Sequence, residues 1–172
     1  ELSKTGCVEF LAETYYHSLS YLYSKDEFHR QIQIHQNKIE KYFNQTPKVL
    51  RNNELNYNNE IAGYAERNGY KGVICNAVNR VLHGKSPNQV FRPTNTTNIR
   101  CLLKHYKLPN NASSIFSNKG WKASPLTVDQ FSHGDYQISE NDDVINLFMN
   151  YEDLGKTTEN ATRFFELLPE AI

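Results

Sequence analysis

The sequence predicts an α/β fold in which parallel strands are flanked by helices. Short apolar runs alternate along the chain with longer amphipathic segments, and this order of strand and helix is typical of α/β domains. The apolar runs are also nearly continuous in hydrophobicity, as strands are when helices cover a parallel sheet on both faces. With 172 residues, the chain is long enough for one ordinary domain with its own core.

The strongest helix signal covers residues 25–43. Apolar side chains recur there at helical spacing on one face, with charged residues between them. Ser24 and Glu27 match a capping box at the start of this segment, and Asn44 is expected to end it.

The remaining elements are shorter, and capping residues or apolar runs indicate them. Three more helices are expected, at 59–67 between the cap Asn58 and Gly69, near 127–133, and after Thr158. Strands are expected over five apolar runs, at 7–11, 48–50, 72–75, 100–103 and 144–149. The stretch 87–125 breaks this rhythm, and we expect it to form a long excursion over one end of the sheet.

The composition argues against several classes of function. Nineteen basic and nineteen acidic side chains cancel, so we expect no binding to nucleic acid or to a membrane surface. We expect no metal site and no cofactor. Gly84-Lys85-Ser86 looks like the end of a phosphate-binding loop, but the glycine that this loop requires earlier in the sequence is absent, so we reject that interpretation. The cysteines are odd in number and widely spaced, so we interpret them as reduced and buried, which favours a cytoplasmic location: Cys7, Cys75 and Cys101.

Polar side chains gather just after the expected strands. Functional residues of parallel α/β folds lie at the C-terminal ends of strands, so these side chains are expected to share one rim. They include Glu13, Tyr15, Tyr16, His17, Arg51, Asn52, Asn53, Glu54, Asn76, Asn79, Asn150, Tyr151 and Glu152. Carboxylates, amides, an imidazole and aromatic rings suit a carbohydrate ligand. On the residues alone, a polar side chain here can simply cap a helix; we expect that of Asn58, and it stays open for Glu54.

Five stretches together resemble glycoside hydrolase family 57, the family of α-amylases, 4-α-glucanotransferases and related α-glucan enzymes. They occur in the family's order over nearly the whole chain: Gly-Cys-Val-Glu-Phe-Leu-Ala-Glu-Thr-Tyr-Tyr-His-Ser-Leu at 6–19, Arg-Asn-Asn-Glu-Leu at 51–55, Ser-Pro-Asn at 86–88, Pro-Leu-Thr at 125–127 and Asn-Leu-Phe-Met-Asn-Tyr-Glu at 146–152. The resemblance implies a (β/α)7 barrel and a retaining mechanism.

The resemblance also implies roles for single residues. Glu54 matches the family's nucleophile, whereas Asn150 occupies the position of its acid/base aspartate, and 153–157 also depart from the family pattern. We therefore expect impaired hydrolysis, with the two side chains about 5–7 Å apart on one rim. Substrate contacts are expected from Glu13, His17, Arg51, Trp121 and Glu152, although Trp121 is as readily a core residue.

Residues 1–172 are expected to form a single, partial domain of the catalytic barrel. The family's first-strand motif would precede Glu1 and its last motif would follow Ile172, so flanking strands are expected outside the chain. Exposed sheet edges then favour self-association. Three functions stay open: an enzyme acting on α-glucans or maltooligosaccharides, a relative that only binds them, and an inactive fragment.

Overall fold

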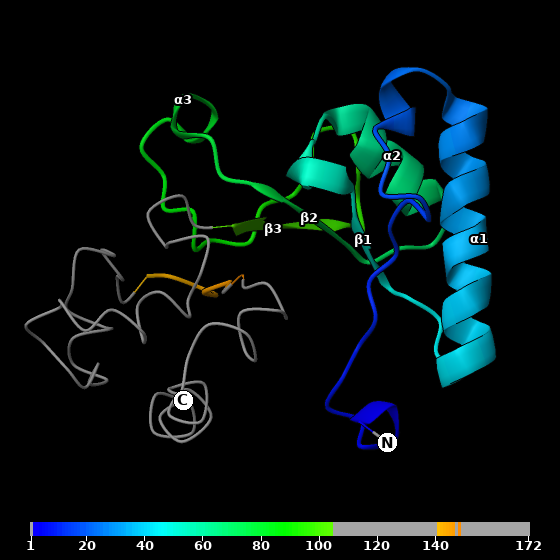
Figure 1. Cartoon of the computed structure of the whole chain (residues 1–172). Coiled ribbons are helices and arrows are strands. Elements are labelled where there is room, and N and C mark those ends of the chain that lie inside the picture. The colour runs from blue at the N-terminus through cyan, green and yellow to red at the C-terminus, as the bar shows by residue number, and fades with distance from the viewer. Residues whose placement is uncertain (1, 105–140, 147, 149–172) are drawn as a thin grey trace, which may run out of the picture. The chain divides into compact units, whose positions relative to one another are not determined.

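The structure is a computed structural model that describes residues 2–104, 141–146 and 148 (Figure 1). Its elements are, in chain order, the 3-10 helices η1 (Leu2–Lys4) and η2 (Ser20–Leu22), helix α1 (Lys25–Phe43), strand β1 (Val49–Arg51), the 3-10 helix η3 (Asn53–Leu55), helix α2 (Asn59–Arg67), strand β2 (Gly72–Asn76), helix α3 (Asn79–Leu82) and strand β3 (Arg100–Lys104). They belong to two compact units, one built from 1–76 and 90–103, the other from 77–89 and residues from 104 onward.

The strands form a sheet in the order β1-β2-β3. Strands β1 and β2 are parallel, with Leu50 opposite Val73. On the other side of β1, Ala12 forms an isolated parallel bridge with Leu50: its N–H donates to Val49 and its carbonyl accepts from Arg51. Segments thus lie side by side in the order in which they occur along the chain, as consecutive strand–helix units require.

Helix α1 begins and ends where its capping residues predict. The Ser24 hydroxyl accepts a hydrogen bond from the Glu27 N–H, and Asn44 ends the helix in the left-handed conformation at φ 53°. The reciprocal half of the predicted capping box is absent from the described contacts, because the Glu27 carboxylate instead accepts from Arg30 and Gln31.

Helix α2 confirms the helix predicted at 59–67 and the predicted cap, Asn58. The Asn58 side chain accepts from the Ile61 N–H at 2.9 Å, which satisfies one of the donors left free at a helix start. The Tyr21 hydroxyl donates to the same Asn58 side chain, so the cap also fixes α2 to the segment before α1. Gly69, expected to stop the helix, lies just beyond it with φ 83°.

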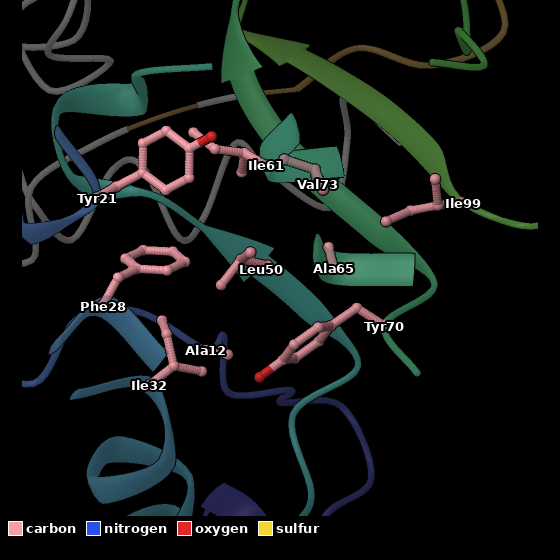
Figure 2. Close-up of a cluster of buried hydrophobic side chains, with 10 residues drawn as sticks. All are labelled: Ala12, Tyr21, Phe28, Ile32, Leu50, Ile61, Ala65, Tyr70, Val73 and Ile99. Atoms are coloured by element: carbon pink, nitrogen blue, oxygen red, sulfur yellow. The ribbon is translucent and has the colours of Figure 1, made fainter. Parts of the chain in front are cut away.

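The core of the first unit lies between the two helices and one face of the sheet (Figure 2). Phe28 and Ile32 of α1 meet Leu50 of β1, while Ile61 of α2 and Val73 of β2 close the cluster. Burying side chains of this size contributes about 1.5–3 kcal/mol each, so this cluster holds the two helices against the sheet.

Three predictions about the chain ends and the cysteines need correction. Residues 7–11 form no strand, and the pairing with β1 is confined to the bridge at Ala12. Cys7 is exposed rather than buried, whereas Cys75 and Cys101 are buried as expected. The described part of 144–149 also forms no strand; the helices expected near 127–133 and after Thr158 lie outside the described residues.

The second unit is built partly around Asn88. This side chain is buried and donates to the Asp142 carboxylate, while the backbone carbonyl of Asn88 accepts from the N–H groups of Asp143 and Val144. The preceding helix α3 was not predicted, because a four-residue turn carries no apolar period. Among the described residues, no helix is both long and apolar enough to cross a membrane.

Candidate functional site

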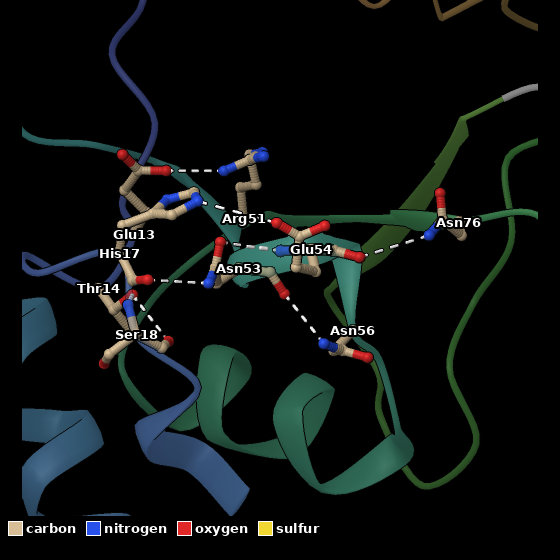
Figure 3. A network of polar contacts seen from close by, with 9 residues as sticks. All are labelled: Glu13, Thr14, His17, Ser18, Arg51, Asn53, Glu54, Asn56 and Asn76. Carbon is tan, nitrogen blue, oxygen red and sulfur yellow. Dashed lines mark hydrogen bonds and ion pairs between the residues drawn. The ribbon is translucent and has the colours of Figure 1, made fainter. Parts of the chain in front are cut away.

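Several of the expected polar side chains, Glu13, His17, Arg51, Asn53 and Glu54, lie together beyond the end of β1 and beside Ala12 (Figure 3). Because Ala12 pairs with Leu50, the next residues along, Glu13 and Arg51, are neighbours on the opposite face of the sheet. Arg51 donates to the Glu13 carboxylate at 2.8 Å, and both side chains are partly exposed. Two of the expected substrate contacts are therefore already paired with each other.

Glu54 lies one turn beyond β1, in η3, with an unusual backbone. Its φ is 53° and that of Leu55 is 54°, in the left-handed region that residues with a Cβ rarely adopt. Conformations of this kind cost about 1–3 kcal/mol each and gather at functional sites. The strained turn directs the Glu54 carboxylate away from the protein, since its side chain is 71% exposed and caps no helix among the described residues.

His17 is the partner of Glu54 within this site. Its Nε2 lies 3.8 Å from Glu54 Oε1, and its own φ is 52°. The imidazole is also largely exposed, so a charged pair here contributes at most about 1 kcal/mol to stability. The pair matters for its position instead: it places a group able to donate or accept a proton beside the carboxylate.

Asn53 holds both members of this pair in place. Its Oδ1 accepts from the Glu54 N–H at 3.0 Å, and its Nδ2 donates to the His17 carbonyl at 2.9 Å. Asn53 is only 5% exposed, so its side-chain amide depends on these two bonds rather than on water. One buried amide thus joins two left-handed residues that are far apart in sequence.

The neighbouring Asn52 is a second buried amide below the site. Its Nδ2 donates to the Asn56 carbonyl and closes the turn around Glu54, while its Oδ1 has no hydrogen-bond partner among the described residues. The sequence places both amides on the rim but gives them no role. Their position between a strand end and a carboxylate is the signal that could have marked them as supports of the turn.

Glu13 also influences a histidine on α1. Burial lowers the pKa of His35, and the Glu13 carboxylate opposes that shift by favouring the protonated ring. His35 Nδ1 is buried with no hydrogen-bond partner in the described part of the chain. The Glu13 carboxylate therefore lies near two basic groups, His35 and Arg51.

The other expected site residues, Trp121, Asn150 and Glu152, lie outside the described residues, as does the separation expected between Glu54 and Asn150. Within the described ranges, no three histidine, cysteine, aspartate or glutamate side chains come together as a metal site would require.

A groove of about 500 Å³ lies elsewhere, between α1 and α2. The Lys25 ammonium sits 3.4 Å over the Tyr21 ring within it and pairs with Glu60 at 2.9 Å. Glu13, His17, Arg51 and Glu54 do not line this groove. The strand ends, not the groove, gather the residues that the sequence singled out.

Comparison with known proteins identifies the family. The model of glycosyl hydrolase family 57 matches residues 1–172. A protein of Methanocaldococcus jannaschii named "Putative alpha-amylase" is 36% identical over 169 residues, which cover 98% of this chain but 35% of that protein. The crystal structure of 4-alpha-glucanotransferase from Thermococcus litoralis matches 99% of the chain and 26% of its own, with a TM-score of 0.63 and 15% identity.

These matches agree with the strand order and the flanking helices. The structural similarity confirms the predicted fold class, parallel strands with flanking helices that form part of a barrel. The chain spans only about a third of the length of the curated relative and about a quarter of the solved structure. Because the family model covers every residue, the chain belongs to glycoside hydrolase family 57.

Proposed function

We propose that this chain carries the nucleophile of an α-glucan-active retaining enzyme, with Glu54 in that role and with hydrolysis impaired at Asn150. The observation that carries the proposal is the Glu54 turn, in which a strained backbone exposes the carboxylate beside His17. Family membership supports a carbohydrate substrate. The names of the two relatives, an α-amylase and a 4-α-glucanotransferase, support an α-glucan or maltooligosaccharide.

The proposed first step forms a covalent glycosyl-enzyme. A Glu54 carboxylate oxygen attacks the anomeric carbon as the bond from that carbon to the leaving oxygen breaks, and the leaving oxygen takes up a proton. An acid normally supplies the proton, and its conjugate base then deprotonates the water that releases the sugar. The amide of Asn150 can do neither near neutral pH.

The missing acid sets the expected size of the defect. General acid–base catalysis contributes about 10²–10⁴-fold, so natural glucan should be cleaved that much more slowly than by a relative with an aspartate. Glu13, His17, Arg51, Trp121 and Glu152 are proposed to contact the substrate. Asn150 itself can still donate to and accept from a sugar hydroxyl.

Asn150 and the departures at 153–157 also favour a second candidate, a relative that binds α-glucan without cleaving it. This candidate needs the same rim and the same ligand, and it differs only in chemistry. Turnover and binding measured separately on the full-length protein distinguish the two.

The decisive experiment uses an activated substrate. Fluoride leaves without a proton, so an α-glycosyl fluoride should load Glu54 and stall, giving a covalent sugar adduct by mass spectrometry. Glu54→Gln is the matched control and should give none. Asn150→Asp should raise hydrolysis of maltooligosaccharides by about 10²-fold or more. Binding without an adduct in the wild type supports the non-catalytic candidate, and absence of both contradicts an α-glucan function.

We further propose that residues 1–172 form part of a larger catalytic barrel and act in the cytoplasm. Two of the three cysteines are buried and all three are free, which supports a reducing compartment. The isolated chain is proposed to self-associate through a sheet edge. Light scattering over a range of concentrations tests this, and a constant mass of about 20.0 kDa would contradict it.

A further inference from the structure

The loop that carries His17 also exposes two aromatic rings. Residues 14–18 connect the Ala12 bridge to the segment before α1. Tyr16 is 61% exposed and Tyr15 is 38% exposed, and their rings meet edge to face with centroids 4.9 Å apart. Aromatic side chains exposed side by side are candidates for a binding surface.

Buried polar groups hold this loop in one shape. The buried Thr14 hydroxyl accepts from the Ser18 N–H at 3.0 Å and donates to the Ser18 carbonyl at 3.2 Å. The side-chain Oε1 of the buried Gln31, on α1, accepts from the Ser18 hydroxyl at 2.7 Å and from the Tyr16 N–H at 3.4 Å. Asn53 holds the His17 carbonyl from the other side.

Such a network fixes the backbone of the loop that carries the exposed rings. Buried polar groups that are satisfied only in one arrangement fix that arrangement, and here three elements contribute them. A loop held in this way binds a ligand with little loss of backbone conformational freedom.

The loop lies directly beside the proposed nucleophile. His17 follows Tyr16 in sequence, and its ring is 3.8 Å from the Glu54 carboxylate. A polymer that places one sugar over Glu54 must therefore extend its neighbouring units across nearby surface, and the exposed tyrosines of the same loop can offer aromatic faces to such a unit. Pyranose rings present C–H faces that pack on aromatic rings and hydroxyls that pair with tyrosine O–H groups.

We propose that Tyr15 and Tyr16 form an aromatic subsite that binds a neighbouring glucose unit of the α-glucan. Tyr16 packs against the sugar face, and Tyr15 supports it edge-on. This inference rests on the proposed function and adds to it the place where the glucan chain continues beyond Glu54. It predicts that longer maltooligosaccharides bind more tightly than short ones and that Tyr16 accounts for the difference.

The test is calorimetric titration of the full-length protein with maltose and maltohexaose. Tyr16→Ala should weaken maltohexaose binding about tenfold and leave maltose binding within about twofold. Tyr16→Trp should retain the affinity for the long ligand, because it keeps an aromatic face. Tyr42→Ala is the matched control: Tyr42 is 62% exposed but lies at the far end of α1, and its loss should change neither affinity.

The outcomes separate this inference from the proposed function. Wild-type binding with unchanged affinity in Tyr16→Ala would overturn the subsite and leave the proposed function intact. Equal losses for maltose and maltohexaose would also overturn it, because the ring would then act at the first sugar. If Tyr16→Ala changed the mass measured by sedimentation but not the affinity for sugar, the rings would instead belong to an interface between protein chains, and the subsite would be overturned. A wild-type protein that binds neither sugar would overturn the function together with the subsite.

Discussion

Replacement of Asn53 by alanine tests whether one buried amide builds the site. The change removes the acceptor of the Glu54 N–H and the donor to the His17 carbonyl. It also creates little new space, so loss of the two hydrogen bonds dominates the effect.

The expected loss of stability follows from the two bonds. Each intramolecular hydrogen bond contributes about 1 kcal/mol net, and a buried group left unsatisfied costs about 1–3 kcal/mol. Both freed groups belong to residues with exposed side chains, so water reaches them in part and the lower end applies. We expect Asn53→Ala to lower the free energy of unfolding by about 2 kcal/mol, or the melting temperature by about 4–8 °C.

Urea unfolding followed by circular dichroism measures this loss, and hydrogen exchange locates it. The Glu54 amide should exchange about tenfold or more faster in Asn53→Ala, while amides within α1 keep their rates. Asn56→Ala is the control, because this exposed side chain donates one 3.3 Å bond to the same turn and should cost less than about 0.5 kcal/mol. Equal stability of the two variants would refute the role assigned to Asn53.

Three further predictions concern the core, a cap and pH. Phe28→Ala should lower the free energy of unfolding by about 3–5 kcal/mol in urea titration, since the ring is almost fully buried; a loss under 1 kcal/mol would contradict the packing. Asn58→Ala should cost about 1 kcal/mol by the same assay and Asn58→Ser much less, whereas equal losses would argue against capping. Burial lowers the pKa of His35 from 6.5, so the unfolded chain binds this proton first and stability should fall as pH drops below about 6.5. In His35→Gln, urea midpoints at about pH 8 and pH 5 should differ less than in the wild type, and an unchanged difference would exclude His35 as a cause.

Helices were predictable because their signals are local. The spacing of apolar residues and the caps Ser24, Asn44 and Asn58 act within one or two turns of the residues they stabilise, so both described long helices agree with expectation. Strands β1, β2 and β3 agree to within one residue at each end, because their apolar runs are short and bounded.

The prediction of a strand at 7–11 was wrong because strand pairing depends on contacts with residues far away in the sequence. Residues 7–11 have the composition of a strand, but backbone pairing with β1 occurs only at Ala12, one residue beyond the predicted end. Cys7 is exposed for the same reason, since it lies ahead of the pairing that would bury it.

Within the described part of the site, the sequence predicted a shared rim but neither the pairs that form on it nor what holds them. Strand-end position brought Glu13 to Arg51 and His17 to Glu54 as expected of a shared rim. The left-handed turns and the Asn53 bonds were not predictable, because the Asn53 amide reaches a carbonyl 36 residues away. That contact exists only once the sheet has brought both loops together.

The left-handed backbone at Glu54 separates what favours folding from what the proposed chemistry needs. Glycine adopts φ near 53° without the clash of a Cβ, so Glu54→Gly is expected to fold as well as the wild type or better, by up to about 1 kcal/mol. A variant library selected only for folding should therefore enrich glycine at this position, and a library selected for loading by a glycosyl fluoride should return glutamate. At this position, a substitution that improves stability also removes the proposed nucleophile.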